Sequence, residues 1–138
     1  MPIIEWTEEF SIGNPTLDDQ HKKWFSIYNK AHDRMMDPDE KNFISTGIDS
    51  LKEMKAYGEY HFSTEEETMA AAGFPELEKH KLMHRAFSRD IDGMIQGLES
   101  GNHVLNSEVI KRIENWLRHH ILKEDLKFKT FSEQKGRG

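Results

Sequence analysis

Histidines and a glutamate recur at helical spacing in two neighbouring stretches of this 138-residue chain. In HFSTE, His61 and Glu65 stand four residues apart, and in HKLMH the same spacing separates His80 from His84. Side chains four residues apart on an α-helix share one face, about 40° apart around the axis and about 6 Å apart along it. Each pair can therefore reach a common centre, where imidazole nitrogens and a carboxylate oxygen are suitable ligands for a metal ion.

Two further histidines, His21 and His120, fall on the apolar faces of other segments with helical periodicity. A single histidine in such a position is usually a hydrogen-bonded core residue. Five histidines and a glutamate are different, because burying them all without partners would cost on the order of several kcal/mol. A bound metal satisfies these groups, so the pattern predicts a metal centre inside the protein.

The donor types limit which metal fits. The chain has no cysteine, which excludes disulfides, iron–sulfur clusters, zinc–thiolate sites and cysteine nucleophiles. Imidazole and carboxylate ligands suit iron, manganese or zinc. One zinc ion takes about four ligands, fewer than are offered here, and the HExxH motif of zinc proteases is absent because Lys81 follows His80. Two metal ions bridged by carboxylates fit the set better.

The excess of histidine over carboxylate also favours one chemistry. Ferritin-like di-iron sites are built mainly from glutamates. Neutral imidazoles place less negative charge on the metals than carboxylates do, and this stabilises the reduced state. Reversible dioxygen binding is therefore favoured over oxidation chemistry.

Four amphipathic segments would position these donors, with helices predicted at about 18–36, 41–72, 75–99 and 106–131. Thr16 or Asp18 is the expected cap of the first helix, and Gly73 before Pro75 ends the second. Short connections between four helices predict an all-α, antiparallel up-down-up-down four-helix bundle. A non-helical arm, 1–17, is expected to lie across the bundle because it contains Trp6, and a polar tail, 132–138, is expected to fray.

Length and charge set the remaining expectations. A chain of this size suits one domain, 1–138, and its formal charge of −6 without a basic stripe argues against a nucleic-acid partner. No apolar run approaches the roughly 20 residues of a membrane span, and MPIIEWTEEF lacks the features of a secretory signal. We expect a cytoplasmic monomer that makes no contact with membranes.

Four stretches in order, LDDQH (17–21), HFSTEE (61–66), GFPELEKHKLMH (73–84) and WLRHHILKED (116–125), resemble the pattern of the hemerythrin family. The single-domain prokaryotic bacteriohemerythrins are the members most similar to it. The resemblance covers nearly the whole chain, with Leu17 as a conservative departure from the usual isoleucine. It implies a four-helix bundle that binds dioxygen reversibly, without enzymatic turnover, at two non-heme iron ions joined by an oxo or hydroxo bridge.

The resemblance also implies a role for each donor. Three histidines would fill one iron, two would hold the other and leave it an open position, and two carboxylates would bridge them. By position these are, in that order, His80, His84 and His120; His21 and His61; and Glu65 and Asp125.

The second bridging carboxylate is where helix geometry and the resemblance disagree. On an ideal α-helix Glu124 lies about 40° from His120, whereas Asp125 lies about 140° away. Geometry alone selects Glu124, while the family spacing selects Asp125. We follow the resemblance and expect Glu124 to be solvated.

Other side chains near the donors have plainer expectations. Glu66 and Glu67 fall off the inward stripe and are expected on the wet surface, as is His119, while His103 has no assigned role. His32 is expected to be a core or bundle-end histidine. Candidates to line a dry ligand pocket, with ordinary core packing as the equal alternative for each, are Trp24, Phe25, Trp116, Leu117 and Ile121.

Two other functions remain compatible with the same ligands. One is a di-iron enzyme or scavenger that acts on peroxide, nitric oxide or ferrous iron. Such a protein would differ from a carrier only in how dry its ligand pocket is and how easily substrates reach it. The other is a sensor or interaction domain whose bundle shifts on ligation.

Overall fold

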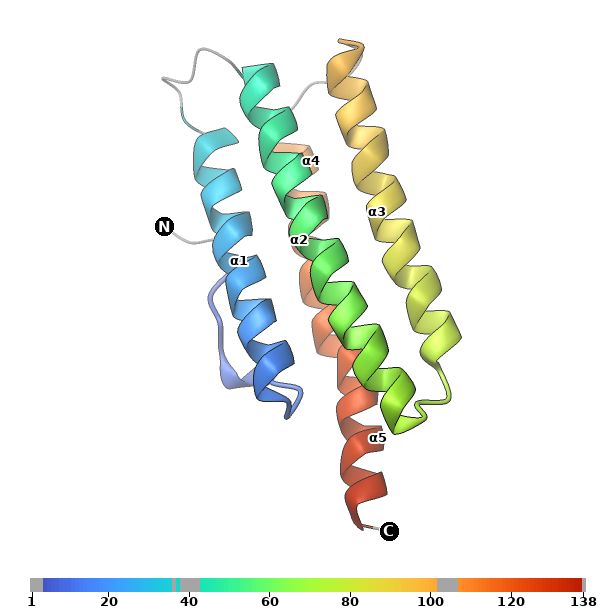
Figure 1. The fold of residues 1–138 in the computed structure, drawn as a ribbon. Coiled ribbons are helices and arrows are strands. Elements are labelled where there is room, and N and C mark those ends of the chain that lie inside the picture. Colours follow the sequence, from blue (N-terminus) through green and yellow to red (C-terminus); the bar gives the residue numbers. More distant parts are fainter. Residues whose placement is uncertain (1–3, 36, 38–42, 102–106, 138) are drawn as a thin grey trace.

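The protein folds into four antiparallel helical rods, described by a computed structural model for residues 4–35, 37, 43–101 and 107–137 (Figure 1). A short turn in the arm, η1 (Glu8–Phe10), precedes the rods. The rods are α1 (Pro15–Met35), α2 (Phe43–Ala72), α3 (Leu77–Glu99) and a last one that joins α4 (Ser107–His119), η2 (His120–Asp125) and α5 (Leu126–Arg137). These residues contain no strand, and successive rods run in opposite directions, which confirms the all-α up-down-up-down four-helix bundle.

The apolar stripe of α3 shows why these segments form helices that pack. Its buried positions recur at alternating intervals of three and four, from His80 and His84 through Phe87 and Ile91 to Leu98. One face of the helix is therefore apolar and turns inward, and full burial of each large side chain contributes roughly 1.5–3 kcal/mol. In the part of the chain that is described, no helix is both long and apolar enough to cross a membrane.

The turn between α2 and α3 ends α2 as predicted. Gly73 has φ of 74°, a left-handed conformation that suits a residue without a Cβ. The backbone N–H of Phe74 then donates to the carbonyl of Met69 at 3.0 Å, which satisfies a carbonyl that the helix end leaves free. Helix α3 begins at Leu77, two residues later than the predicted position 75.

The start of α1 differs from the prediction. The helix begins at Pro15, not at 18, and its cap is neither Thr16 nor Asp18. Asn14 serves instead, because its Oδ1 accepts the backbone N–H of Leu17 at 3.1 Å. Proline directly after this cap suits the first helical position, since its missing N–H has no partner there.

Asp18 holds the arm against α1. Its carboxylate accepts the hydroxyl of Ser11 at 2.6 Å and the backbone N–H of Ile12 at 2.9 Å. Farther along the helix, Asn29 receives the backbone N–H of Ile4 at 3.1 Å and donates to the carbonyl of Ile4 at 2.9 Å. The predicted packing of the arm on the bundle is thus confirmed, with side chains of α1 completing the arm's backbone hydrogen bonds.

The last rod is longer than expected. Helix α5 continues to Arg137, so the residues predicted as a frayed tail, 132–138, are helical as far as that position. Phe131 packs against the apolar cluster of Met69, Phe74 and Phe128, which anchors the turn before this extension. The predicted helix limits at 36, 41 and 106 lie outside the described residues.

The interior is divided into two apolar clusters of unequal size. The larger contains Trp24, Phe62, Phe87 and Ile121, and the smaller is built on Met69, Phe74 and Phe128. Along each of α2, α3 and the last rod, the predicted donor residues lie between members of the two clusters. The helices therefore hold a polar layer between two apolar blocks.

Candidate metal centre

All seven predicted donors are buried and meet in this layer. One comes from α1, two from α2, two from α3 and two from η2, so every rod contributes. In chain order they are His21, His61, Glu65, His80, His84, His120 and Asp125. Each is 3 % exposed or less, which for a charged or polar side chain requires compensating partners.

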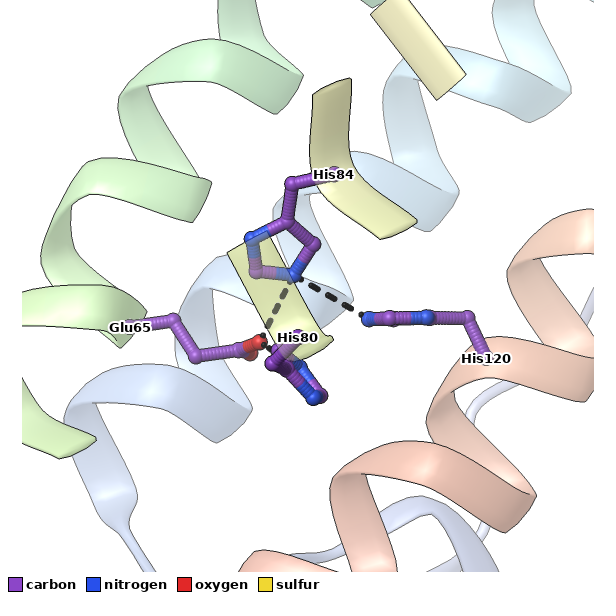
Figure 2. Close-up of side chains that lie close together, drawn as sticks. All are labelled: Glu65, His80, His84 and His120. Carbon is purple, nitrogen blue, oxygen red and sulfur yellow. Dashed lines mark hydrogen bonds and ion pairs between the residues drawn. The ribbon is translucent and has the colours of Figure 1, made fainter. Parts of the chain in front are cut away.

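The donors form two overlapping groups, and within each group the ligand atoms all lie within 4.8 Å of one another. The first group is Glu65, His80, His84 and His120, and the second is His21, His61, Glu65 and Asp125. Figure 2 shows the first group, in which four side chains from α2, α3 and the last rod point toward one region. Glu65 is common to both groups.

Each carboxylate presents one oxygen to each side of the centre. Glu65 places Oε1 2.7 Å from Nε2 of His80 and 3.1 Å from Nε2 of His84. Its Oε2 lies 3.0 Å from Nε2 of His61 and 3.6 Å from Nε2 of His21. A carboxylate shared in this way has the arrangement of a bridge between two metal ions.

Asp125 repeats the arrangement from the opposite rod. Its Oδ1 lies 2.9 Å from Nε2 of His80 and 3.2 Å from Nε2 of His120. Its Oδ2 lies 3.3 Å from Nε2 of His21. Asp125 therefore reaches the three-histidine group as well as the two-histidine group.

The segment η2 explains how Asp125 can share a face with His120. The residues His120–Asp125 form a π-helix, in which the backbone hydrogen bonds run from i to i+5. A spacing of five then brings side chains into line, as a spacing of four does in an α-helix. Glu124, which ideal α-helical geometry would select, instead pairs with Lys127 at 3.0 Å, and its side chain is 13% exposed, less solvated than expected.

Several donor atoms have no satisfactory partner within the protein. Nε2 of His21, Oε2 of Glu65 and Oδ2 of Asp125 are buried without a hydrogen bond among the described residues. The Nε2 atoms of His84 and His120 face each other at 3.1 Å, although both are ring nitrogens aimed at the same point. Cations between these atoms would satisfy them all, so the residues fit two bound metal ions.

Electrostatics inside the layer also favour positive charge. Burial raises the pKa of the Asp125 carboxyl, and Glu65 does so too, but contacts with His120 and His21 outweigh both and hold it well below its usual value. Burial lowers the pKa of His21, yet the neighbouring carboxylates of Asp125 and Glu65 prevail and raise it to about 9. The same balance raises the pKa of His80 to about 10. Without metal, the layer therefore retains protons where cations would bind.

Two contacts fix the orientation of donor histidines from outside the layer. Nδ1 of His61 donates to Oε1 of Gln20 at 2.8 Å, and Nδ1 of His84 donates to Oε2 of Glu66 at 2.7 Å. Because the partner atoms are acceptors, the proton sits on Nδ1 and each Nε2 lone pair faces the layer. Glu66 is partly exposed, as expected of a surface residue, but its contact with His84 was not predicted, and neither was that of Gln20 with His61.

Aromatic rings cover the donors on the side of the larger cluster. Trp116 stacks on His120 with centroids 4.4 Å apart, and Trp24 lies 5.5 Å from His61. Phe62, not among the expected pocket residues, stacks on His84 at 3.8 Å.

The other expected pocket residues differ in position. Leu117 and Ile121 are fully buried in the larger cluster. Phe25 packs edge-on against Phe10 of the arm at 4.9 Å between centroids. Aromatic contact with the donors thus comes from Trp24, Trp116 and the unpredicted Phe62 in the larger cluster, and from Phe74 of the smaller one, 6.5 Å from His80.

Two of the remaining histidines, His32 and His119, lie away from the centre. His119 is exposed, as expected from its position beside His120. His32 is partly exposed near the end of α1 and lies 3.4 Å from its neighbour Asp33. His103 lies outside the described residues.

Comparison with known proteins agrees with this architecture. Residues 13–131 match the family model described as the hemerythrin HHE cation binding domain. A bacteriohemerythrin of Clostridium acetobutylicum is 29% identical over 127 residues, covering 91% of this chain and 98% of that protein. A bacteriohemerythrin of Methylococcus capsulatus is 29% identical over 126 residues, covering 91% of this chain and 93% of that protein.

Solved structures show the same arrangement of helices. The crystal structure of a wild-type hemerythrin superposes with a TM-score of 0.83 at 26% identity, covering 93% of this chain and 96% of that one. That likeness, the family match across most of the chain and two donor groups able to hold metal ions all agree. The chain therefore belongs to the hemerythrin family, whose cofactor is a di-iron centre that binds dioxygen.

Proposed function

We propose that this protein binds dioxygen reversibly, for storage, delivery or sensing, and that it is a carrier and not an enzyme. One iron would be held by three histidines, the other by two, and both by two bridging carboxylates. The proposed ligands are His80, His84 and His120; His21 and His61; and Glu65 and Asp125. When bound, the two irons supply the electrons that hold dioxygen reversibly.

The observation that carries this proposal is the unequal division of the histidines between two shared carboxylates. Glu65 and Asp125 each direct one oxygen to either side, so the sides differ only in their imidazoles. The side with His21 and His61 offers fewer donors and so leaves room for an external ligand. A small diatomic molecule is the ligand class that a buried position of this kind can accept.

The surrounding side chains serve to exclude water. Trp24 is fully buried against His61, and its indole N–H is already used by the carbonyl of Met54 at 3.3 Å. Leu117 and Ile121 are also fully buried. A dry wall stabilises a bound neutral ligand, because water would otherwise compete for the open position.

The test is an absorption spectrum of the reduced, iron-loaded protein before air, after air and after removal of dioxygen. We expect a visible band that appears with air and disappears on deoxygenation. This change should be repeatable over many cycles. A protein that instead consumes dioxygen, peroxide or nitric oxide catalytically would be an enzyme or scavenger, and the proposal would be wrong.

A matched pair of variants ties the spectrum to the proposed ligands. His120→Ala removes a buried histidine that lies 3.2 Å from Asp125, whereas His119→Ala removes its exposed neighbour. We expect only His120→Ala to lose iron and the dioxygen-dependent band. Equal behaviour of the two variants would contradict the ligand assignment.

A further inference from the structure

We propose that Glu66 is a positioning residue that sets the reduction potential of the centre through its hydrogen bond with His84. Gln20 makes the corresponding hydrogen bond with His61 but carries no charge. The inference rests on the proposed function, because it concerns how the protein balances the ferrous and ferric states. It assigns a role to a carboxylate outside the ligand set.

The contact between Glu66 and His84 is short and aimed away from the metal layer. Oε2 of Glu66 accepts the N–H of Nδ1 at 2.7 Å, while Nε2 of the same ring lies 3.1 Å from Oε1 of Glu65. The imidazole thus connects an outer carboxylate to the interior donor cluster. Phe62 stacks on the ring at 3.8 Å and limits its rotation, so the connection is held in place.

The location of Glu66 keeps its carboxylate close to solvent while its partner is buried. The Glu66 side chain is 25% exposed, whereas that of His84 is 2% exposed. Both residues line a groove of about 470 Å³ between α2 and α3, together with Ser63 and Arg85. A charged group can therefore act on the buried centre without the full desolvation cost of an interior carboxylate.

A carboxylate behind a ligating imidazole changes the metal's preference. The hydrogen bond from an N–H to a carboxylate is charge-assisted, and it increases the basicity of the other ring nitrogen. A more basic Nε2 donates more electron density, which stabilises the more positive ferric ion relative to the ferrous one. Glu66 should therefore lower the reduction potential on the three-histidine side.

Gln20 provides the internal contrast. Its Oε1 accepts the N–H of His61 Nδ1 at 2.8 Å, nearly the same distance as on the other side. Gln20 is an amide and carries no charge, and its own Nε2 donates to the hydroxyl of Thr64 at 3.4 Å. Both rings are oriented by an acceptor, but only His84 has a negatively charged one. Gln20 therefore only orients its histidine, whereas Glu66 orients its histidine and also adds the effect of its charge.

The variant Glu66→Gln separates those two roles, and Glu67→Gln is its matched control. Glu66→Gln keeps an acceptor oxygen and removes the charge, while Glu67→Gln removes the same charge from the exposed neighbouring residue. A redox titration of the iron-loaded proteins measures the potential, with each ferrous ion giving one electron to the mediator. We expect Glu66→Gln to shift the ferrous–ferric equilibrium of the affected iron about tenfold toward ferrous, a rise of about 59 mV.

Two further measurements make the test independent of dioxygen binding. Glu66→Ala removes the acceptor as well as the charge, so a chelator should extract iron roughly 10–100-fold faster than from Glu67→Gln. In the iron-free protein, ¹⁵N NMR should show the proton of His84 on Nδ1 in Glu66→Gln and a mixture of tautomers in Glu66→Ala. The reciprocal variant Gln20→Glu should lower the potential of the iron on the two-histidine side.

The outcomes are distinct from failure of the proposed function. If the unaltered protein binds no iron or no dioxygen, the proposed function fails before any variant is compared. If it binds both, and Glu66→Gln has the same potential as Glu67→Gln, the inference is overturned even when Glu66→Ala loses iron. Glu66 would then only orient His84.

Discussion

The charge and orientation of single side chains decide whether the buried layer can accept metal ions. Nε2 of His61 faces the layer because its Nδ1 is committed to Gln20 at 2.8 Å. Glu65 and Asp125 then supply the negative charge, and each contacts histidines on both sides of the centre. Loss of a shared carboxylate should therefore affect both ions, whereas loss of one histidine should affect one side first.

Replacement of Asp125 and of Glu124 by alanine distinguishes the shared carboxylate from its neighbour. Asp125 is fully buried and lies within 3.3 Å of His21, whereas Glu124 pairs with Lys127. We expect Asp125→Ala to lose most of its iron, and Glu124→Ala to keep two ions per chain. Metal analysis of the purified proteins, with circular dichroism to verify folding, measures the difference. Iron loss confined to Glu124→Ala would contradict the assignment.

The sequence predicted the buried donors but not the residues that orient them. His80 and His84 were visible because a spacing of four on a helix is a local property of the chain. Gln20 and His61 are 41 residues apart, and their contact depends on how α1 and α2 pack. The contact between Glu66 and His84 is not predictable for the same reason, since the apolar periodicity of α2 alone cannot show that α3 brings His84 to it.

Among the helical elements, η2 is the one whose local geometry a periodicity of 3.6 residues cannot predict. Its π-helical bonds place Asp125 beside His120, where an ideal α-helix would place Glu124. The family resemblance selects the spacing that brings Asp125 into the buried layer, but no residue preference within HILKED identifies a π-helix. The extension of α5 to Arg137 was missed for a related reason, because its last residues are polar and lack an apolar stripe.

Deletion of Lys123 tests whether η2 exists to position Asp125. Lys123 is exposed, and its removal leaves a spacing of four, which an α-helix can accommodate without turning α5. The aspartate would then stand four residues after His120 on one face of an α-helix, as it stands five residues after it on one face of the π-helix. We expect the iron-free variant to remain as stable as the parent in urea unfolding, and the loaded variant to keep its iron, whereas iron loss would show that Asp125 requires the π-helical geometry itself. Lys123→Ala, which keeps the length, should behave like the parent.

A close approach between α1 and α2 depends on Gly58. A Cβ added there would lie 2.8 Å from Cζ2 of Trp24, a ring that is fully buried and hydrogen-bonded to Met54. The ring has no room to move, so Gly58→Ala should destabilise the protein by about 1–3 kcal/mol. This cost exceeds the roughly 0.5–1 kcal/mol that alanine gains over glycine inside a helix.

Gly93 in α3 offers the matched control for this substitution. It is exposed, and an added Cβ there would meet no atom within 4 Å. Gly93→Ala should therefore stabilise the protein by about 0.5–1 kcal/mol. Urea unfolding of both iron-free variants measures the two signs, and destabilisation of both would show that contact with Trp24 is not the cause.

The protein as a whole places an electrostatically demanding layer between two apolar clusters. Seven buried polar side chains cannot all be satisfied by one another, as the unpartnered Nε2 of His21 and Oε2 of Glu65 show. Metal binding removes this deficit, so iron and folding should be coupled. The fold can hold the layer because α1 to α5 enclose it with apolar side chains on both sides.

The pH dependence of stability should therefore differ between iron-free and iron-loaded protein. Without iron, the neighbouring carboxylates overcome burial and raise the pKa of His21 to about 9 and of His80 to about 10. A histidine whose folded pKa exceeds its ordinary value of about 6.5 stabilises the fold fully below that value and loses the effect as pH rises through its folded pKa. The iron-free protein should thus lose a few kcal/mol of unfolding free energy between about pH 6.5 and 10.

Acid should destabilise the iron-free protein for the opposite reason. The histidine contacts hold the pKa of Asp125 and of Glu65 below their usual values, so their contribution is present above about pH 4 and disappears as pH falls. Iron replaces the protons on the imidazoles, and stability of the loaded protein should stay nearly constant from about pH 6.5 to 9. Urea unfolding of both forms across this pH range measures how the free energy of unfolding depends on pH. Equal slopes of unfolding free energy against pH in the two forms would mean that the buried histidines do not bind the metal.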